Sequence, residues 1–267
     1  MEIFYWDKLD LKKSGPVITG KTALTVGSFD GPHIGHEALF KSVFDAAQKH
    51  SLIPGIITFT RPLPSLKNSS SYVGDIASLS QRLSGYEARG FRFALLIDFS
   101  PDFAKMRGNA FLHTLVSRFS MKFIAEGQDF RYGYKGAYGK KEMEACAKDL
   151  DFQTAFHSAV LHDGERISSS GIRQKIFGGE LSGIKAVLGR AYAVDMNDMP
   201  FEKDENGALI FDRRRFTQVL PERGVYNVMV NTSLGNLRAH LEAGIKTVRL
   251  FGAAFNELPR IRTVEFL

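Results

Sequence analysis

Short hydrophobic runs alternate with amphipathic stretches from Lys21 onward. Five runs have the length and composition of buried strands and occupy residues 23–27, 52–59, 91–97, 121–127 and 151–160. Between them, apolar side chains recur at three- and four-residue steps, which predicts one helix over about residues 35–49 and another around residues 111–119. Strands that alternate with helices indicate right-handed crossovers and a parallel sheet covered on both faces. We therefore expect an α/β domain that binds ligands beyond the carboxyl ends of its strands.

The pattern changes after about residue 192. Short apolar runs separated by turn residues predict a small β domain, with strands over residues 208–211, 224–231, 237–243, 245–251 and 261–267. Two short helical segments, 169–178 and 180–189, precede it. We expect two domains, residues 1–192 and residues 193–267. Residues 61–72 contain two prolines and four serines, which predicts a loop that leaves the second strand and could act as a flap.

Composition and charge exclude several classes of protein. Of the 267 residues, 44% are hydrophobic and 24% charged, which excludes disorder as the main state. No apolar run approaches the ~18 residues that span a bilayer, and acidic residues occupy the N-terminus where a signal peptide would be apolar, so we expect a cytoplasmic protein with no membrane partner. The single cysteine, Cys146, excludes an internal disulfide, and no Cys/His spacing resembles a zinc site. The net charge of +6 is scattered, with no arginine-rich run before residue 213, so we expect no nucleic-acid partner.

The strongest local signal is the segment VGSFDGPHIGHEALF at residues 26–40. Gly27 and Gly31 would let the backbone approach a ligand closely, and a helix that starts near residue 34 or 35 would present unpaired N–H groups and a positive dipole end to an anion. His33 and His36 lie at that end, where a bound metal cation would face the positive dipole. We therefore expect both imidazoles to hold phosphates and to stabilise charge that develops on phosphoryl oxygens. Two solvent-exposed histidines are the alternative, although they leave the flanking glycines unexplained.

The string GxFDGxHxGH in this segment resembles the N-terminal signature of bacterial bifunctional riboflavin kinase/FAD synthetases, within the HxGH nucleotidylyltransferase superfamily. Three further segments resemble motifs of the same family in the same order, at residues 126–133, 167–173 and 178–192. The resemblance covers about residues 21–192. It implies a Rossmann-like FMN adenylyltransferase domain that transfers AMP from ATP to FMN, giving FAD and pyrophosphate. It also implies Mg²⁺ as the cofactor, with metal ligands that the sequence does not identify.

The resemblance assigns roles to individual residues. His33 and His36 would contact ATP phosphates, and Arg173 would supply a cation for the departing pyrophosphate. The implied nucleotide-binding residues are Gly27, Ser28, Phe29, Asp30, Gly31, Ser168, Ser169 and Ser170. The implied flavin-binding residues are Arg61, Asp129 and Arg131. Because the FMN phosphate is already anionic near neutral pH, positioning and charge neutralisation suffice without a general base.

Several of these residues also have plain structural interpretations. The three serines could form the N-cap cluster of a helix. Asp30 could bind a ribose hydroxyl or hold its turn by accepting backbone N–H groups, and the turn role is favoured. Phe29 is more typical of a packing residue than of a ligand contact. Asp129 and Arg131 could form an internal ion pair, and Tyr132 could stack on a ligand ring or pack in the core.

Two segments depart from the family pattern. Residues 57–65 lack the family's Phe-x-Pro-His-Pro sequence, which leaves the acceptor open; Arg61 there could grip a phosphate or be a solvated loop arginine. Residues 194–216 contain neither the Pro-Thr-Ala-Asn motif nor the paired glycines of the riboflavin kinase barrel, although residues 220–231 and the C-terminal TVEFL resemble its strands. The resemblance therefore implies a degenerate kinase-like β domain that does not phosphorylate riboflavin. The arginines at 213–215 fit a charged strand edge better than a phosphate or nucleic-acid patch.

The sequence thus favours an FAD synthetase-type adenylyltransferase with ATP and FMN as small-molecule substrates. One alternative is a nucleotidyltransferase that acts on a different phosphorylated acceptor. Another is a non-catalytic flavin- or nucleotide-binding protein, and the oligomeric state is left open.

Overall fold

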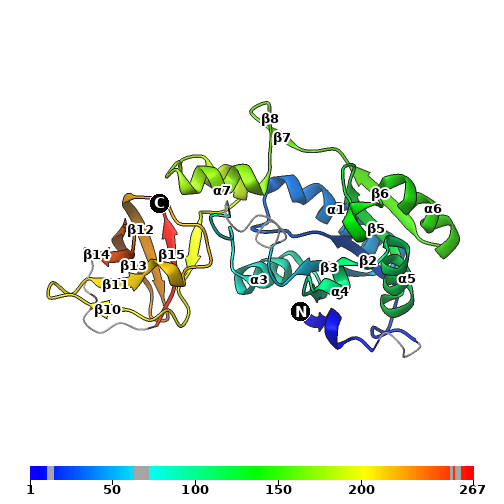
Figure 1. The fold of residues 1–267 in the computed structure, drawn as a ribbon, viewed down its shortest axis with the longest axis horizontal. Coiled ribbons are helices and arrows are strands. Elements are labelled where there is room, and N and C mark those ends of the chain that lie inside the picture. Colours follow the sequence, from blue (N-terminus) through cyan, green and yellow to red (C-terminus); the bar gives the residue numbers. More distant parts are fainter. Residues whose placement is uncertain (11–14, 63–71, 253–254, 256–259) are drawn as a thin grey trace. The chain divides into compact units, whose positions relative to one another are not determined.

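Six parallel strands form the sheet of the N-terminal compact unit (Figure 1). The computed structural model describes residues 1–10, 15–62, 72–252, 255 and 260–267. The strands are β1 (Glu2–Tyr5), β2 (Thr22–Val26), β3 (Ile53–Phe59), β4 (Phe93–Ile97), β5 (Met121–Gly127) and β6 (Gln153–His157). Their order across the sheet is β1-β4-β3-β2-β5-β6. The five predicted strands are confirmed. β1 was not predicted, because its four residues are too few to show a period, are mostly exposed, and form a strand by pairing with β4.

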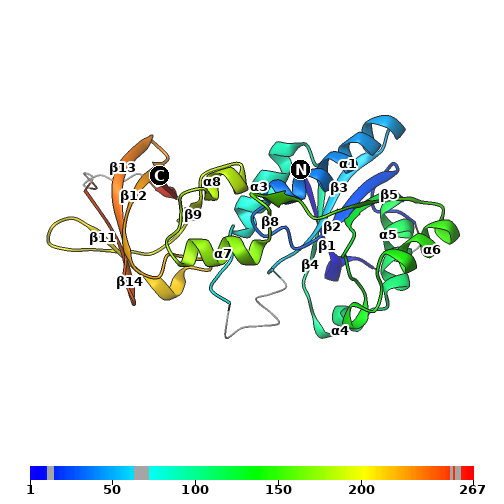
Figure 2. The ribbon, with the colours of Figure 1, turned by 90° about the horizontal axis from the view of Figure 1, so that it is seen from above.

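Helices cover both faces of this sheet (Figure 2). One buried cluster joins side chains of α1 (Ile34–His50) and α3 (Leu79–Arg89) to one face, and a second joins α5 (Gly108–Phe119) and α6 (Lys140–Leu150) to the other. Successive side chains of a strand point to opposite faces of the sheet, so Ala23 of β2 lies in the first cluster and Leu24 in the second. The predicted α/β sheet and its two covered faces are confirmed. A four-residue helix, α4 (Pro101–Ala104), precedes α5.

The strand order creates a switch point between β2 and β5. From β2 the chain moves outward through β3 to β4, and after β4 it returns to the other side of β2 to form β5 and β6. In open α/β sheets, the crevice at the carboxyl ends of such a strand pair is the usual ligand site. The loop that follows β2 begins at this point and carries the segment with the two histidines.

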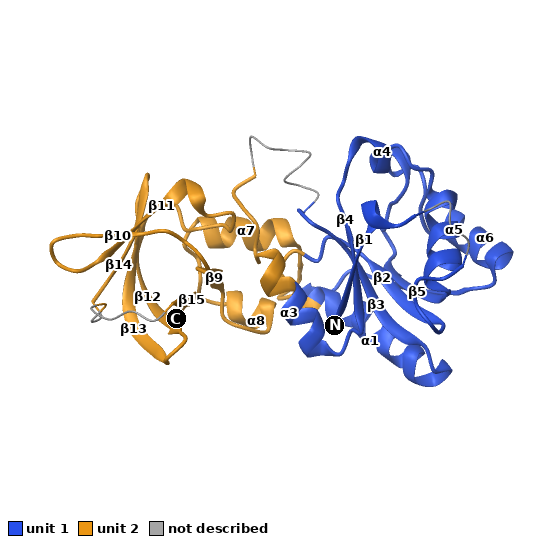
Figure 3. Cartoon of the chain, turned by 90° about the horizontal axis from the view of Figure 1, so that it is seen from below, with its two compact units in different colours: residues 1–29, 35–66, 83–161 blue, residues 30–34, 67–82, 162–267 orange. Residues whose placement is uncertain are grey.

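The second compact unit contains a seven-stranded antiparallel sheet and two short helices (Figure 3). Its strands are β9 (Ala193–Asp195), β10 (Glu202–Lys203), β11 (Leu209–Asp212), β12 (Gly224–Thr232), β13 (Asn236–Ala243), β14 (Thr247–Phe251) and β15 (Ile261–Phe266). The helices α7 (Ser169–Phe177) and α8 (Ile184–Leu188) share a buried cluster with this sheet. The predicted barrel-like β region is confirmed, and β9 and β10 are short additions to it.

The compact units are discontinuous in sequence. The first comprises residues 1–29, 35–66 and 83–161, and the second residues 30–34, 67–82 and 162–267. The domain boundary after residue 192 stays a prediction. Most of the predicted loop at 61–72 falls on residues 63–71, which lie outside the described residues. No described helix is both long and apolar enough to cross a membrane.

Two predicted strand ends were wrong. The strand expected over 151–160 ends at residue 157, and a hairpin of β7 (Leu161–His162) and β8 (Glu165–Arg166) follows. Asp163 and Gly164 in its turn both have positive φ, as a two-residue hairpin turn requires. The strand expected from residue 245 begins at residue 247, because Gly244 N–H donates to the Thr247 carbonyl and closes a turn.

Arg213 and Arg214 of the arginine run at 213–215 bind groups close to them in the C-terminal region. Arg213 donates to main-chain carbonyl groups of four residues, Leu220, Pro221, Glu222 and Gly244. Arg214 pairs with Asp212 at 2.7 Å. The run forms a 3-10 helical turn after β11 and not the charged strand edge that we expected, and these contacts favour a structural role over a phosphate or nucleic-acid patch.

A buried carboxyl group extends the pairing of β2 with β5. The backbone register of the two strands runs to Leu24 and Ile124, and beyond it Val26 N–H donates to Glu126 Oε1 at 2.7 Å. Glu126 is only 1% exposed. Burial raises the pKa of Glu126 well above its ordinary value of 4.5, partly opposed by the Val26 hydrogen bond.

We expect Glu126→Gln to stabilise the protein at pH 8 but not at pH 4. Because the folded-state pKa is raised, the unfolded state loses its proton first, and stability falls as the pH rises above 4.5. Glutamine stays neutral and keeps an oxygen for Val26. At pH 8, thermal unfolding should show a Tm gain of about 2–4 °C for each kcal/mol of unfolding free energy regained. Exposed Glu165→Gln is the control. An equal Tm difference at both pH values would contradict this account.

Candidate functional site

The start of the loop after β2 is shaped by the ring of Phe29. Phe29 is 3% exposed and packs edge-on against His36, with ring centroids 5.0 Å apart. A Cβ on Gly27 would lie 2.8 Å from this ring, so the close approach that Gly27 permits is made by Phe29. The Ser28 carbonyl accepts a hydrogen bond from Thr58 Oγ1 at 2.9 Å. The packing interpretation of Phe29 therefore agrees with the structure.

Gly31 makes a close approach of the same kind. Its φ is +65°, and a Cβ there would lie 2.3 Å from Ile76 Cγ2. A side chain at this position would therefore be strained and would also clash. The described structure accounts for Gly31 by packing against Ile76, a contact that the sequence did not indicate.

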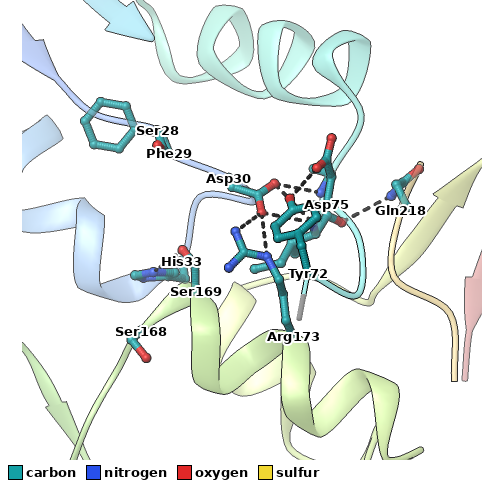
Figure 4. Close-up of polar contacts among 12 residues, drawn as sticks. Ser28, Phe29, Asp30, His33, Tyr72, Asp75, Ser168, Ser169, Arg173 and Gln218 are labelled. Atoms are coloured by element: carbon teal, nitrogen blue, oxygen red, sulfur yellow. Dashed lines mark hydrogen bonds and ion pairs between the residues drawn. The ribbon is translucent and has the colours of Figure 1, made fainter. Parts of the chain in front are cut away.

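Asp30 and Arg173 form a buried ion pair at the centre of the site (Figure 4). They are 1% and 4% exposed. Arg173 donates from Nε and Nη2 to Asp30 Oδ2, and the same carboxylate accepts N–H groups of Ile76 at 3.0 Å and Ala77 at 3.4 Å. Asp30 therefore does bind backbone N–H groups, but those of residues 76 and 77 instead of its own turn. Arg173 is not an open cation, because its charge is neutralised inside the protein.

Tyr72 and Asp75 complete this buried cluster. The Arg173 guanidinium lies over the Tyr72 ring at 5.0 Å from its centroid, and the Tyr72 hydroxyl donates to Asp75 Oδ1. Burial raises the pKa of Tyr72 and of Asp75. No motif or period in the sequence singled out either side chain; Tyr72 is the last residue of the predicted loop at 61–72, and Asp75 follows it.

His33 is buried beside the start of α7. It is 4% exposed, and its Nε2 lies 3.4 Å from Ser169 Oγ. Burial, reinforced by the Arg190 cation, lowers the pKa of His33 from 6.5 to about 4. Arg190 also donates to the Pro32 carbonyl at 2.9 Å and so holds the turn before His33. The exposed alternative is wrong for His33, which is a neutral imidazole at neutral pH.

The three serines have different positions at the start of α7. Ser168 is the N-cap, and its Oγ accepts Gly171 N–H at 3.1 Å. Ser169 faces His33, and Ser170 is exposed on the first turn. The N-cap interpretation therefore accounts for Ser168 alone. The other two hydroxyls lie where a helix N-terminus favours an anion.

The residues that the resemblance assigns to flavin belong to the first compact unit. Arg61 is exposed just after β3, and Asp129 is exposed after β5. Arg131 donates from Nε to the Gly136 carbonyl at 3.0 Å. Tyr132 is 7% exposed and stacks on Phe130 with centroids 5.6 Å apart, so it packs in the core.

The described residues do not build a magnesium site. Among them, no group of three or more His, Cys, Asp or Glu side chains is placed to hold a metal. Asp30 is committed to Arg173 and two N–H groups, and the Asp75 carboxylate to the Tyr72 hydroxyl. The role of Mg²⁺ stays a prediction, and no protein ligand is assigned to it.

Comparisons with known proteins show which family this chain resembles in sequence. A family model described as FAD synthetase matches residues 16–171, more than half of the chain. The chain is 28% identical over 215 residues to the bifunctional riboflavin kinase/FMN adenylyltransferase of Escherichia coli, covering 78% of this chain and 67% of that protein. It is 24% identical over 180 residues to the protein of the same description from Buchnera aphidicola, covering 66% of this chain and 57% of that protein.

This chain thus spans little more than half of the Buchnera protein. A solved structure from Streptococcus pneumoniae, described as a macrolide-efflux protein, matches 100% of this chain and 98% of its own, with a TM-score of 0.78 and 21% identity. That likeness shows a shared fold.

We expect the Asp30–Arg173 pair to be strongly coupled in stability. Removing one partner leaves the other charge buried, so Asp30→Asn and Arg173→Met should each lower the free energy of unfolding by about 3–5 kcal/mol. The double variant should cost clearly less than the sum of the two. Urea denaturation of the four proteins measures the coupling, and additive losses would contradict a buried pair.

We expect His33 to stay neutral where ordinary histidines titrate. Its pKa of about 4 means that its imidazole resonances should hold constant down to about pH 5. NMR titration of the histidine ring protons tests this, with His33→Gln to assign the signal. A midpoint near 6.5 for the assigned signal would show that His33 is solvated.

Proposed function

This chain belongs to the FAD synthetase family, and from that premise we propose that it is an FMN adenylyltransferase, which transfers AMP from ATP to the phosphate of FMN and releases pyrophosphate. The observation that carries the proposal is the contact between His33 and Ser169. It joins the loop after β2 to the N-terminus of α7 and so gathers phosphate-binding groups from two motifs that are far apart in the sequence.

The proposed site works by positioning. The FMN phosphate oxygen attacks the α-phosphorus of ATP, a new P–O bond forms, and the bond to the β-phosphate oxygen breaks with pyrophosphate as the leaving group. A neutral His33 offers an N–H donor without needing a proton from solvent. The hydroxyls of Ser169 and Ser170 and the positive end of the α7 dipole favour the phosphate chain. ATP enters as its magnesium complex, so that the metal is part of the substrate.

Arg173 acts indirectly in this proposal. Because it is 4% exposed and paired with Asp30, its cation does not reach pyrophosphate in the described arrangement. It anchors α7 to Asp30 and so holds Ser169 and the helix N-terminus in register with His33. This revises the direct contact with pyrophosphate that the resemblance implied.

The proposal includes the absence of riboflavin kinase activity. The sequence contains no Pro-Thr-Ala-Asn motif, and the region 194–216 where the family carries it is occupied here by β9, β10, β11 and a turn braced by Arg213. Because that motif supplies the phosphate cradle in the family, we expect this chain not to orient a γ-phosphate toward riboflavin.

We expect the purified protein, with ATP and Mg²⁺, to form FAD and pyrophosphate from FMN and to form neither FMN nor FAD from riboflavin. His36→Ala should lower kcat/KM about 100-fold by removing one charge-stabilising donor, and exposed His113→Ala should leave it unchanged. Chromatography of the flavins and an assay of pyrophosphate provide the measurement.

Three outcomes would contradict the proposal in different ways. FMN formed from riboflavin would overturn the absence of kinase activity. AMP transfer to another phosphorylated acceptor, but not to FMN, would show that the protein has a different substrate, and the altered segment at 57–65 would be the first place to look for the cause. ATP or FMN binding without turnover would indicate a binding protein.

A further inference from the structure

A short segment of the C-terminal region pairs with the backbone that holds Asp30. Asp75 N–H donates to the Thr217 carbonyl at 2.8 Å, and Val219 N–H donates to the Asp75 carbonyl at 2.8 Å. These bonds make an isolated parallel bridge between Asp75 and Gln218. Both segments belong to the second compact unit, so that this pairing is internal to it.

The Gln218 side chain adds polar contacts with four partners to this bridge, its two N–H donors being shared among three acceptors. It is 4% exposed, and its Nε2 lies 3.1 Å from the Ile76 carbonyl and 3.0 Å from both Gln81 Oε1 and the Ala193 carbonyl. Its Oε1 accepts Asp195 N–H at 2.7 Å. One buried amide thus ties β9 to the segment at 75–81. A buried polar group with this many partners is strongly fixed in orientation.

Gly74 shows how closely the two backbones approach. Its φ is +125°, and a Cβ there would lie 2.6 Å from Val219 N and 2.7 Å from the Gln218 carbonyl carbon. Both are main-chain atoms, which cannot move aside as a side chain can. The backbone at Gly74 therefore packs against residues 218 and 219 without space for a side chain.

Residue 76 links this pairing to the ion pair through its backbone. Its N–H donates to the Asp30 carboxylate, while its carbonyl accepts from Gln218 Nε2. A rotation of the segment that broke the second bond would also misalign the first. Asp30 would then lose backbone donors, and the guanidinium of Arg173 would lose its fixed partner.

We propose that Gln218 is a positioning residue for nucleotidyl transfer, acting through residue 76 on the Asp30–Arg173 pair. This inference rests on the proposed function. The C-terminal β region, in which no kinase motif is found, thereby serves the transferase site by supplying one of its supports. Gln218 contacts neither substrate nor reacting atoms in this role.

Gln218→Met tests the proposal, because methionine keeps the volume and removes every hydrogen bond of the amide. We expect kcat for FAD formation to fall about tenfold, with KM for ATP and FMN changed less than about twofold. Asn231→Ala is the matched control: it removes an amide that bonds Thr263 within the same sheet, and it should lower Tm without lowering kcat.

A second measurement reads the ion pair without turnover. In the ¹⁵N-arginine spectrum, the Nε–H signal lost in Arg173→Lys reports the bond to Asp30. That signal should shift or exchange faster with solvent in Gln218→Met and stay unchanged in Asn231→Ala. In an Asp30→Asn background, Gln218→Met should have little further effect on kcat, since the group through which it acts is already altered.

The outcomes separate the two proposals. If the unmodified protein forms no FAD from FMN, the proposed function is overturned and this inference with it. If it forms FAD and Gln218→Met keeps full kcat, or leaves the Arg173 signal unchanged, only the role of Gln218 is overturned. Equal losses of kcat in Gln218→Met and Asn231→Ala would also overturn this role, because they would show that Gln218 contributes only to the stability of the fold.

Discussion

The buried ion pair of Asp30 with Arg173 is the constraint on which the candidate site depends. Two charges taken out of water carry a large desolvation penalty, which their attraction offsets only when further hydrogen bonds satisfy the carboxylate. Here the N–H groups of residues 76 and 77 supply those bonds. The pair therefore requires three segments to meet: the loop after β2, the segment at 75–77, and α7.

Much of the chemistry assigned to the motif follows from packing around that pair. Gly31 is needed because Ile76 lies against it, and Gly27 because the Phe29 ring does. His33 is neutral because it is buried and faces the Arg190 cation. A neutral donor beside a helix N-terminus suits an anionic phosphate group.

The C-terminal β region has structural roles even though its sequence departs from the riboflavin kinase pattern. Its sheet buries its own cluster, and its arginine run braces carbonyl groups. Through residues 217–219 it also seats the backbone that holds Asp30. Loss of a kinase motif therefore carries no implication that the region is dispensable.

Local patterns were enough to predict the central strands, the helices α1, α5 and α7, and the motif residues, because burial on one face of an element leaves a period in the sequence itself. They could not predict β1, whose four residues are ordered by a neighbour about ninety positions away. Nor could they predict that Arg173 would meet Asp30 across 143 positions, or Gln218 residue 76 across 142. Such contacts have no periodic signature, and the exposure and pKa of a side chain depend on every segment that packs around it. The sequence alone thus determined which groups could handle phosphate, and only the tertiary structure decided which are open to a ligand and which hold the others in place.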